Sequence, residues 1–203
     1  MEPIFLSTPR PDRLNFIVMM TRLPKICFIL ATVALLAPPA PGQEKSRVSP
    51  HETVTANVAG DEIKIVYGRP YTKDPKTGAK REIWGGLVPY GKVWRLGADE
   101  ATILTTQKDL DFGGKTVPAG SYSLYLLPSE NGPTNLIVNK QTGQWGTKYE
   151  ESQDLVRIEL KKEKADKPLD QFTIAIETTE NGGGVLKLTW EDTQFWVPFA
   201  VKK

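Results

Sequence analysis

The sequence predicts an all-β protein, a single antiparallel β-sandwich of roughly nine to ten strands. Three observations lead to this fold class. Apolar and polar residues alternate with a period of two in many short segments, which places each apolar set on one side of a strand. Turn-forming residues separate these segments about every 8–12 residues. The chain has neither an internal repeat nor an amphipathic helical run.

The expected strands follow one another along the chain with turn chemistry between them. Residues 74–78 (DPKTG) combine a proline that is preset for a turn with a glycine that is free to adopt positive φ. The charged stretch 161–170 (KKEKADKPLD) is expected to be a solvated loop. Pro198 lacks an N–H, so the last strand is expected to be an edge strand or bulged there. In chain order the expected strands contain 54–58, 63–67, 101–106, 110–112, 121–127, 136–138, 156–160, 172–176, 186–190 and 195–201.

The first 42 residues are expected to be a targeting leader, and residues 43–203 the folded domain. Residues 26–37 (ICFILATVALLA) form an uncharged apolar run, with Arg22 and Lys25 before it and small residues after it. These are the three parts of a secretory signal peptide. The run is too short to span a bilayer, which needs about 20 apolar residues, so no transmembrane segment is expected after leader removal.

Cleavage is expected between Gly42 and Gln43, because the peptidase prefers small residues at the last and third-last positions. The sequence leaves Met1, Met19 and Met20 open as the start. The mature protein is therefore predicted to be periplasmic or secreted.

The composition of the mature part excludes several classes of function. The leader contains four of the 26 basic and two of the 24 acidic residues, which leaves 22 of each. This balance gives no electrostatic attraction to nucleic acid. The only cysteine, Cys27, also lies in the leader, so no disulfide or thiolate chemistry is expected. We expect no cofactor and no metal.

The side chains best suited to bind a ligand are concentrated between residues 67 and 100, where aromatic residues are interspersed with arginines, a lysine and glycines. Aromatic faces stack on rings, and the planar guanidinium pairs with carboxylate or phosphate. The alternative is that the tryptophans belong to the core and the arginines form structural ion pairs with the neighbouring carboxylates. The predicted ligand-binding residues are Tyr67, Arg69, Tyr71, Trp84, Trp94, Arg95, Asp99 and Glu100.

No catalytic residues are assigned from the sequence. His51 is the only histidine, and a surface or capping role is the simpler interpretation. The adjacent Asp99 and Glu100 would point in opposite directions in an extended segment, so they are a poor pair for hydrolysis of a glycosidic bond. The chain has no G-x-S-x-G motif for a serine nucleophile.

Several motifs resemble those of a bacterial family of secreted proteins that is described only as a domain of unknown function. They are RVSPH (47–51), YGRPY (67–71), IWGGLVPYGKVWRLGADEAT (83–102), VPAGSYSLYLLP (117–128) and NKQTGQWGTKY (139–149). The resemblance covers nearly the whole mature chain. It implies a β-rich extracytoplasmic domain and no assigned activity, so no functional residues can be taken from it.

The sequence therefore predicts an exported binding module for a small or oligomeric ligand, anionic or sugar-like, such as a glycan. Two alternatives stay open: a hydrolase that acts through carboxylates, and an envelope interaction protein with no small-molecule site. A pocket lined by arginine and aromatic residues would favour the first, two facing carboxylates the second, and a flat apolar patch the third. The sequence does not determine the oligomeric state.

Overall fold

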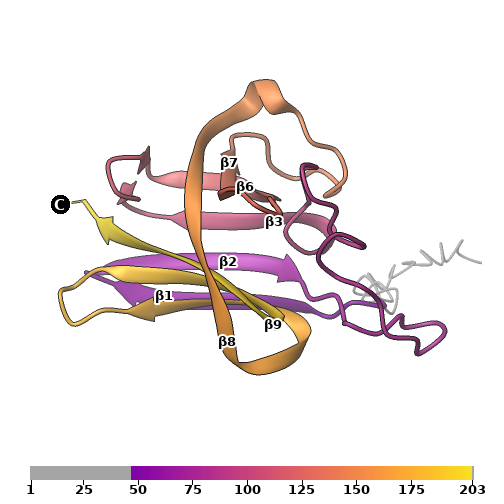
Figure 1. Ribbon diagram of the computed structural model, residues 1–203. Coiled ribbons are helices and arrows are strands. Elements are labelled where there is room, and N and C mark those ends of the chain that lie inside the picture. Colours follow the sequence, from indigo (N-terminus) through magenta and orange to yellow (C-terminus); the bar gives the residue numbers. More distant parts are fainter. Residues whose placement is uncertain (1–46, 203) are drawn as a thin grey trace, which may run out of the picture. The chain divides into compact units, whose positions relative to one another are not determined.

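In the computed structural model, which describes residues 47–202, nine antiparallel strands form one sheet (Figure 1). Their order in the sheet is β1-β2-β3-β6-β7-β8-β9-β4-β5, and a short 3-10 helix, η1 (Glu151–Gln153), precedes β8. The strands are β1 (His51–Val58), β2 (Asp61–Gly68), β3 (Ala98–Thr106), β4 (Leu110–Asp111), β5 (Thr116–Val117), β6 (Gly120–Leu127), β7 (Thr134–Asn139), β8 (Asp154–Thr178) and β9 (Gly184–Val201).

The alternating sequence explains why these segments form strands. In β2 the side chains of Ile63, Ile65 and Tyr67 are buried, whereas those of Glu62 and Lys64 between them are exposed. A strand places successive side chains on opposite faces, so this pattern buries one face of β2 and leaves the other in water. The prediction of an all-β, antiparallel fold is confirmed.

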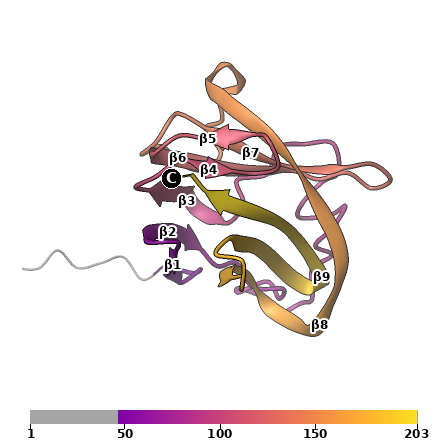
Figure 2. The ribbon, with the colours of Figure 1, turned by 90° about the vertical axis from the view of Figure 1, so that its left-hand side faces the viewer.

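The sheet is continuous and open in the part of the chain that the structure describes. Its two ends are β1 and β5, which do not pair with each other, and the strands are not divided into the two separate sheets of a sandwich. The long strand β8 is the reason, because it pairs with β7 along its first part and with β9 along the rest. Figure 1 shows β8 running across the other strands, and Figure 2 shows its long curve with β9 on its inner side.

The prediction of a solvated loop at residues 161–170 is wrong, because this charged stretch lies within β8. Lys161 and Glu163 pair with Trp196 and Gln194 of β9, which supplies the backbone partners that the polar sequence did not indicate. The Lys161 ammonium also lies 4.6 Å from the centre of the Trp196 ring. Pairing becomes irregular on both sides of Leu169.

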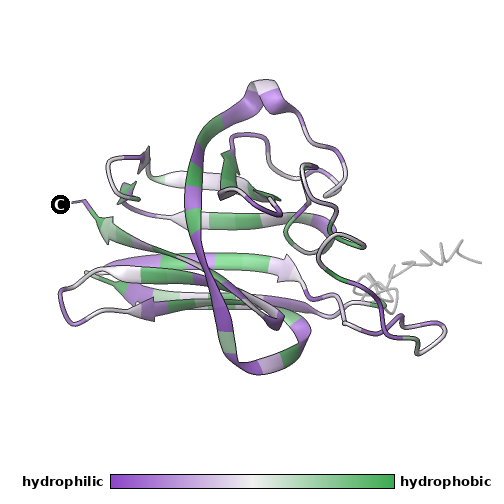
Figure 3. Ribbon diagram, viewed as in Figure 1, coloured by the Kyte–Doolittle hydropathy of each residue, from purple (hydrophilic) through white to green (hydrophobic). Residues whose placement is uncertain are grey.

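A cluster of aromatic rings occupies part of the core. Trp190 of β9 is fully buried and stacks on Trp94, with ring centroids 5.7 Å apart. The ring of Phe172 meets Trp94 edge-on at 5.0 Å, and that of Trp84 meets Phe195 at 5.2 Å. Figure 3 shows hydrophobic and hydrophilic residues alternating along the strands that enclose this core. Rings in such offset and edge-to-face contacts are stabilised beyond simple burial.

The long connection between β2 and β3, residues 69–97, is fixed to the sheet at several points. The backbones of Trp94 and Leu126 exchange two hydrogen bonds of 2.7 and 2.8 Å, and the N–H of Thr72 donates to the Asp170 carbonyl at 2.6 Å. This connection is therefore a scaffolded loop, the type of segment on which binding groups concentrate. Within residues 47–202, no helix is long and apolar enough to cross a membrane. The predicted leader lies outside the described residues.

Candidate functional site

A pocket of about 500 Å³ opens where three connecting segments meet. It is lined by the segment before β1, by the connection between β2 and β3, and by the connection between β7 and η1. Tyr125 of β6 and Trp190 of β9 also reach it. The volume is in the range of small-molecule sites, about 300–1,000 Å³. Its aromatic lining consists of Tyr71, Trp94, Tyr125, Tyr149 and Trp190.

Four of the eight predicted site residues line this pocket: Tyr71, Trp94, Arg95 and Asp99. They come from both ends of the long connection and from the start of β3. The fold therefore brings together residues that are more than twenty positions apart in the sequence.

Three of the other predicted residues have structural contacts outside the pocket lining. Tyr67 is 1% exposed, and its hydroxyl accepts a hydrogen bond of 2.9 Å from the Ile174 N–H. Burial raises the pKa of the Tyr67 hydroxyl. Trp84 packs against the aromatic core, and Glu100 forms an ion pair with Arg47.

Arg69 was expected to share a pocket with Arg95, and the structure corrects this. Its Nη1 lies 2.5 Å from Glu52, its Nε donates to the Phe172 carbonyl at 3.2 Å, and its Nη2 donates to the Thr173 hydroxyl at 2.8 Å. These contacts connect the end of β2 to β8. All three nitrogens of the Arg69 guanidinium therefore have protein partners, which makes this arginine part of the fold.

Arg95 is fixed at one nitrogen. Its Nε donates to the Gly97 carbonyl at 3.1 Å, and its aliphatic stem packs against Gly146, where a Cβ would lie 2.7 Å from Arg95 Cδ. Within residues 47–202, no carboxylate forms an ion pair with Arg95, and its Nη1 and Nη2 have no hydrogen-bond partner. The guanidinium thus keeps the edge that binds carboxylate or phosphate in a bidentate way.

The backbone beside Arg95 adopts an uncommon conformation. Leu96 has φ of 51° and Asp99 has φ of 63°, both in the left-handed region that non-glycine residues rarely occupy. The Thr102 hydroxyl donates to the Leu96 carbonyl at 2.7 Å, which holds the turn in place. Strained residues of this type concentrate at ligand sites.

Four large apolar side chains are exposed among the residues that line the pocket or directly beside them in the sequence. Val48 is 59% exposed, Leu87 41% and Tyr71 39%, and all three line the pocket. Trp145, which is 47% exposed, directly precedes the lining residue Gly146. Clustered apolar exposure of this kind marks an interaction site rather than ordinary surface.

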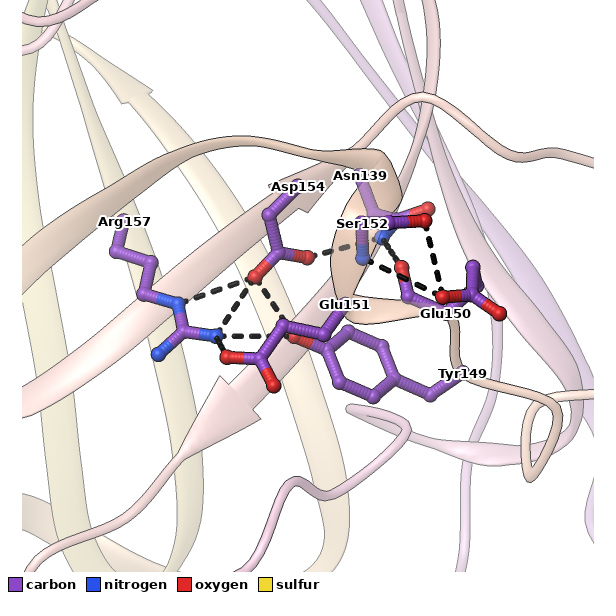
Figure 4. A network of polar contacts seen from close by, with 7 residues as sticks. All are labelled: Asn139, Tyr149, Glu150, Glu151, Ser152, Asp154 and Arg157. Atoms are coloured by element: carbon purple, nitrogen blue, oxygen red, sulfur yellow. Dashed lines mark hydrogen bonds and ion pairs between the residues drawn. The ribbon is translucent and has the colours of Figure 1, made fainter.

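A polar network holds the lining residue Tyr149 in place (Figure 4). The Tyr149 hydroxyl donates to Asp154 at 2.7 Å, and Arg157 donates to the same carboxylate oxygen at 2.8 and 3.0 Å. Asn139 donates to the other Asp154 oxygen at 2.9 Å. Burial, with the Asp154 hydrogen bond second, raises the pKa of Tyr149 to about 12. The network fixes the loop that ends at η1 to the beginning of β8.

His51 lies in a charged cluster behind Asp99. Its Nε2 is 3.4 Å from Asp99 Oδ2 and 3.4 Å from Glu100 Oε2, and Arg47 Nη1 is 2.8 Å from the same nitrogen. The Arg47 guanidinium also binds Glu100 and lowers the pKa of that carboxyl. His51 is an exposed residue, and its charged partners Asp99 and Glu100 lie on β3.

Sequence reasoning missed part of the lining. Tyr149 and Trp190 were not proposed as site residues, and Arg81 and Lys92 were noted only as neighbours of the aromatic residues. The glycine-flanked Trp145 was the available signal for the β7–η1 wall, because open loops with an exposed indole often contact ligands. The lining contains three cations, Arg81, Lys92 and Arg95, and one carboxylate, Asp99.

Comparison with known proteins gives one match. Residues 49–199 match the family described as "Protein of unknown function (DUF2911)". No curated protein and no solved structure matches the chain. The match confirms the expected membership of a family of unknown function, and it covers nearly all of the strands and of the pocket lining.

Proposed function

The protein belongs to the family of proteins of unknown function (DUF2911), and we propose that its domain is a binding module for a small acidic ligand with an apolar or ring-shaped body. The observation that carries the proposal is Arg95, which is fixed through Nε while its two terminal nitrogens have no protein partner within the described residues. An arginine held in this way is preorganised for an anion, since little further side-chain freedom is lost on binding.

The surroundings of Arg95 support a ligand with an apolar body. Five aromatic residues line the pocket, and two of its apolar lining residues, Tyr71 and Leu87, are exposed. The three cations against one carboxylate favour an anionic group over a neutral sugar. The hydrolase alternative gains no such support, because Asp99 is the one carboxylate among the described lining residues.

The proposal is tested by a thermal-shift screen of the full chain against glycans, organic acids and phosphate esters, followed by calorimetry on any compound that raises the melting temperature. Arg95→Ala should weaken binding of an acidic hit about 10- to 150-fold, the loss of a charge-assisted hydrogen bond. Lys64→Ala, which removes an exposed charge on β2, is the matched control and should leave the affinity unchanged. If Arg95→Ala unfolds the chain, or if no acidic compound depends on Arg95, the proposal is wrong.

A protein partner is the second candidate, and the exposed Val48, Tyr71, Leu87 and Trp145 favour it. The two candidates differ in their charge requirement. Replacement of Trp145 by Ala should strongly lower the affinity for a protein partner. The affinity for a small acid in the pocket should instead fall more in Arg95→Ala than in Trp145→Ala.

We further propose that the domain acts outside the cytoplasm after removal of residues 1–42. The uncharged apolar run 26–37 with its small-residue exit supports this. The intact mass of protein purified from an extracytoplasmic fraction should correspond to a chain that begins at Gln43. Recovery of mature protein that still contains residues 1–18 would contradict export through this leader.

A further inference from the structure

His51 lies next to the only carboxylate in the described pocket lining. It begins β1, two residues after Ser49, which itself lines the pocket. Its Nε2 is 3.4 Å from Oδ2 of Asp99, the lining carboxylate. A change of charge on the imidazole therefore takes place 3.4 Å from a carboxylate that lines the pocket.

The neutral and the protonated forms of His51 interact favourably with different neighbours. In the neutral form, an unprotonated Nε2 accepts a hydrogen bond from Arg47 Nη1, which lies 2.8 Å away. In the charged form, the same nitrogen carries a proton and can no longer accept it, so its favourable partners become the carboxylates of Asp99 and Glu100 at 3.4 Å. Imidazole changes charge between about pH 5 and 8.

We propose that protonation of His51 raises the affinity of the pocket for an anionic ligand, because the imidazolium neutralises Asp99. This deepens the proposed function and rests on it, since it concerns the regulation of the same site. The sign follows from charge: the ionised Asp99 repels an anion that approaches Arg95, and a positive charge beside Asp99 reduces that repulsion.

The other charged groups around His51 do not cancel this effect. Arg47 holds Glu100 and lowers its pKa, so that carboxylate stays ionised over the range in which imidazole titrates. Glu52, the next residue of β1, is engaged by Arg69. The partner of His51 on β2 is Gly68, which has no charge. A proton on His51 therefore adds a positive charge 3.4 Å from the carboxylates of Asp99 and Glu100.

The test uses two dyes of similar shape and different charge on the full chain. Anilinonaphthalene sulfonate carries an anion on an aromatic body, and its sulfonate does not titrate in this range, whereas phenylnaphthylamine lacks the sulfonate. Fluorescence titrations between about pH 8 and pH 5.5 should show the affinity for the sulfonate rising about three- to tenfold as the pH falls. The affinity for the neutral dye should stay constant.

Variants identify the groups responsible. His51→Gln should remove the pH dependence, and Asp99→Asn should give the high affinity at every pH, since asparagine also tolerates the left-handed backbone at this position. Near-ultraviolet circular dichroism at each pH confirms that the chain is folded. If either folded variant keeps the wild-type pH dependence, or if the wild type shows none, the proposal is overturned. If the sulfonate binds equally well to Arg95→Ala, the proposed function itself fails and the inference fails with it.

Linkage supplies a second readout that does not depend on folding of the variants. Because His51 is the only histidine, its ring resonances need no assignment by mutation. Saturation with the sulfonate dye should shift the His51 titration midpoint upward by the logarithm of the same affinity ratio, and the neutral dye should not shift it. An unchanged midpoint in the presence of bound sulfonate would exclude coupling between the histidine and the pocket.

Discussion

The regions around Arg69 and Arg95 differ in how many guanidinium nitrogens have a protein partner. Around Arg69, the guanidinium contacts Glu52, the Phe172 carbonyl and the Thr173 hydroxyl, and connects the end of β2 to β8. Around Arg95, one nitrogen is fixed by the Gly97 carbonyl, and the rest faces a pocket with exposed apolar residues at its mouth.

The difference shows that neighbouring aromatic residues do not define the role of an arginine. Both arginines follow or precede aromatic residues and lie near strand ends. What separates them is how many of their five N–H donors are occupied by the protein. A guanidinium whose three nitrogens all contact the protein contributes to the fold, and one that is held at a single nitrogen and lines a pocket is available to a ligand.

The largest expected effect concerns the ring on which both regions depend. Trp190 stacks on Trp94 beside Arg95 and also contacts Phe172, whose carbonyl accepts from Arg69. Trp190→Ala should destabilise the chain by about 3–5 kcal/mol, measured by urea unfolding, because it leaves a large cavity. Trp190→Phe should cost far less, since the indole N–H has no partner within the described residues. If the free energy of unfolding falls equally in the two variants, packing around the Trp190 ring is not the cause of the destabilisation.

An intermediate effect separates the two arginines directly. Arg69→Ala removes hydrogen bonds from a charged, partly buried group and should lower the free energy of unfolding by about 1.5–3 kcal/mol. Arg95→Ala should lower it by less than about 1 kcal/mol. Binding of anilinonaphthalene sulfonate should show the reverse order. Equal losses of stability in both variants would contradict the distinction between a structural Arg69 and a ligand-binding Arg95.

The smallest effect tests the wall of the pocket that Arg95 faces. The pKa of Tyr149 is raised to about 12 from an ordinary value of 10.0, so the folded state favours the neutral hydroxyl. This contribution to stability is present below pH 10 and is lost as the pH rises toward 12. Between about pH 8 and pH 11, the wild type should lose about 0.5–1 kcal/mol more than Tyr149→Phe, after allowance for solvent screening of a partly exposed group. If the free energy of unfolding, measured with urea, falls equally in the wild type and in Tyr149→Phe, the network of Figure 4 does not hold the Tyr149 hydroxyl in its neutral form.

The sequence alone is enough to predict an all-β, antiparallel protein and the region of the candidate site. Alternation in segments such as Ile63–Tyr67 determined which residues form strands, because the side-chain period of a strand is fixed by its backbone. The concentration of arginines, aromatic residues and glycines between residues 67 and 100 identified the connection that lines the pocket. Both are local properties, which neighbouring residues decide.

The arrangement of strands in one open sheet and the set of residues in the candidate site depend on contacts between distant parts of the chain. The charged stretch 161–170 became a strand because β9 supplied partners distant in the sequence. Arg69 was withdrawn from the candidate site by contacts with Phe172 and Thr173, and Trp190 joined it from β9. These outcomes depend on which groups meet across the fold, and a guanidinium or an indole has the same local sequence whether or not a distant partner satisfies it.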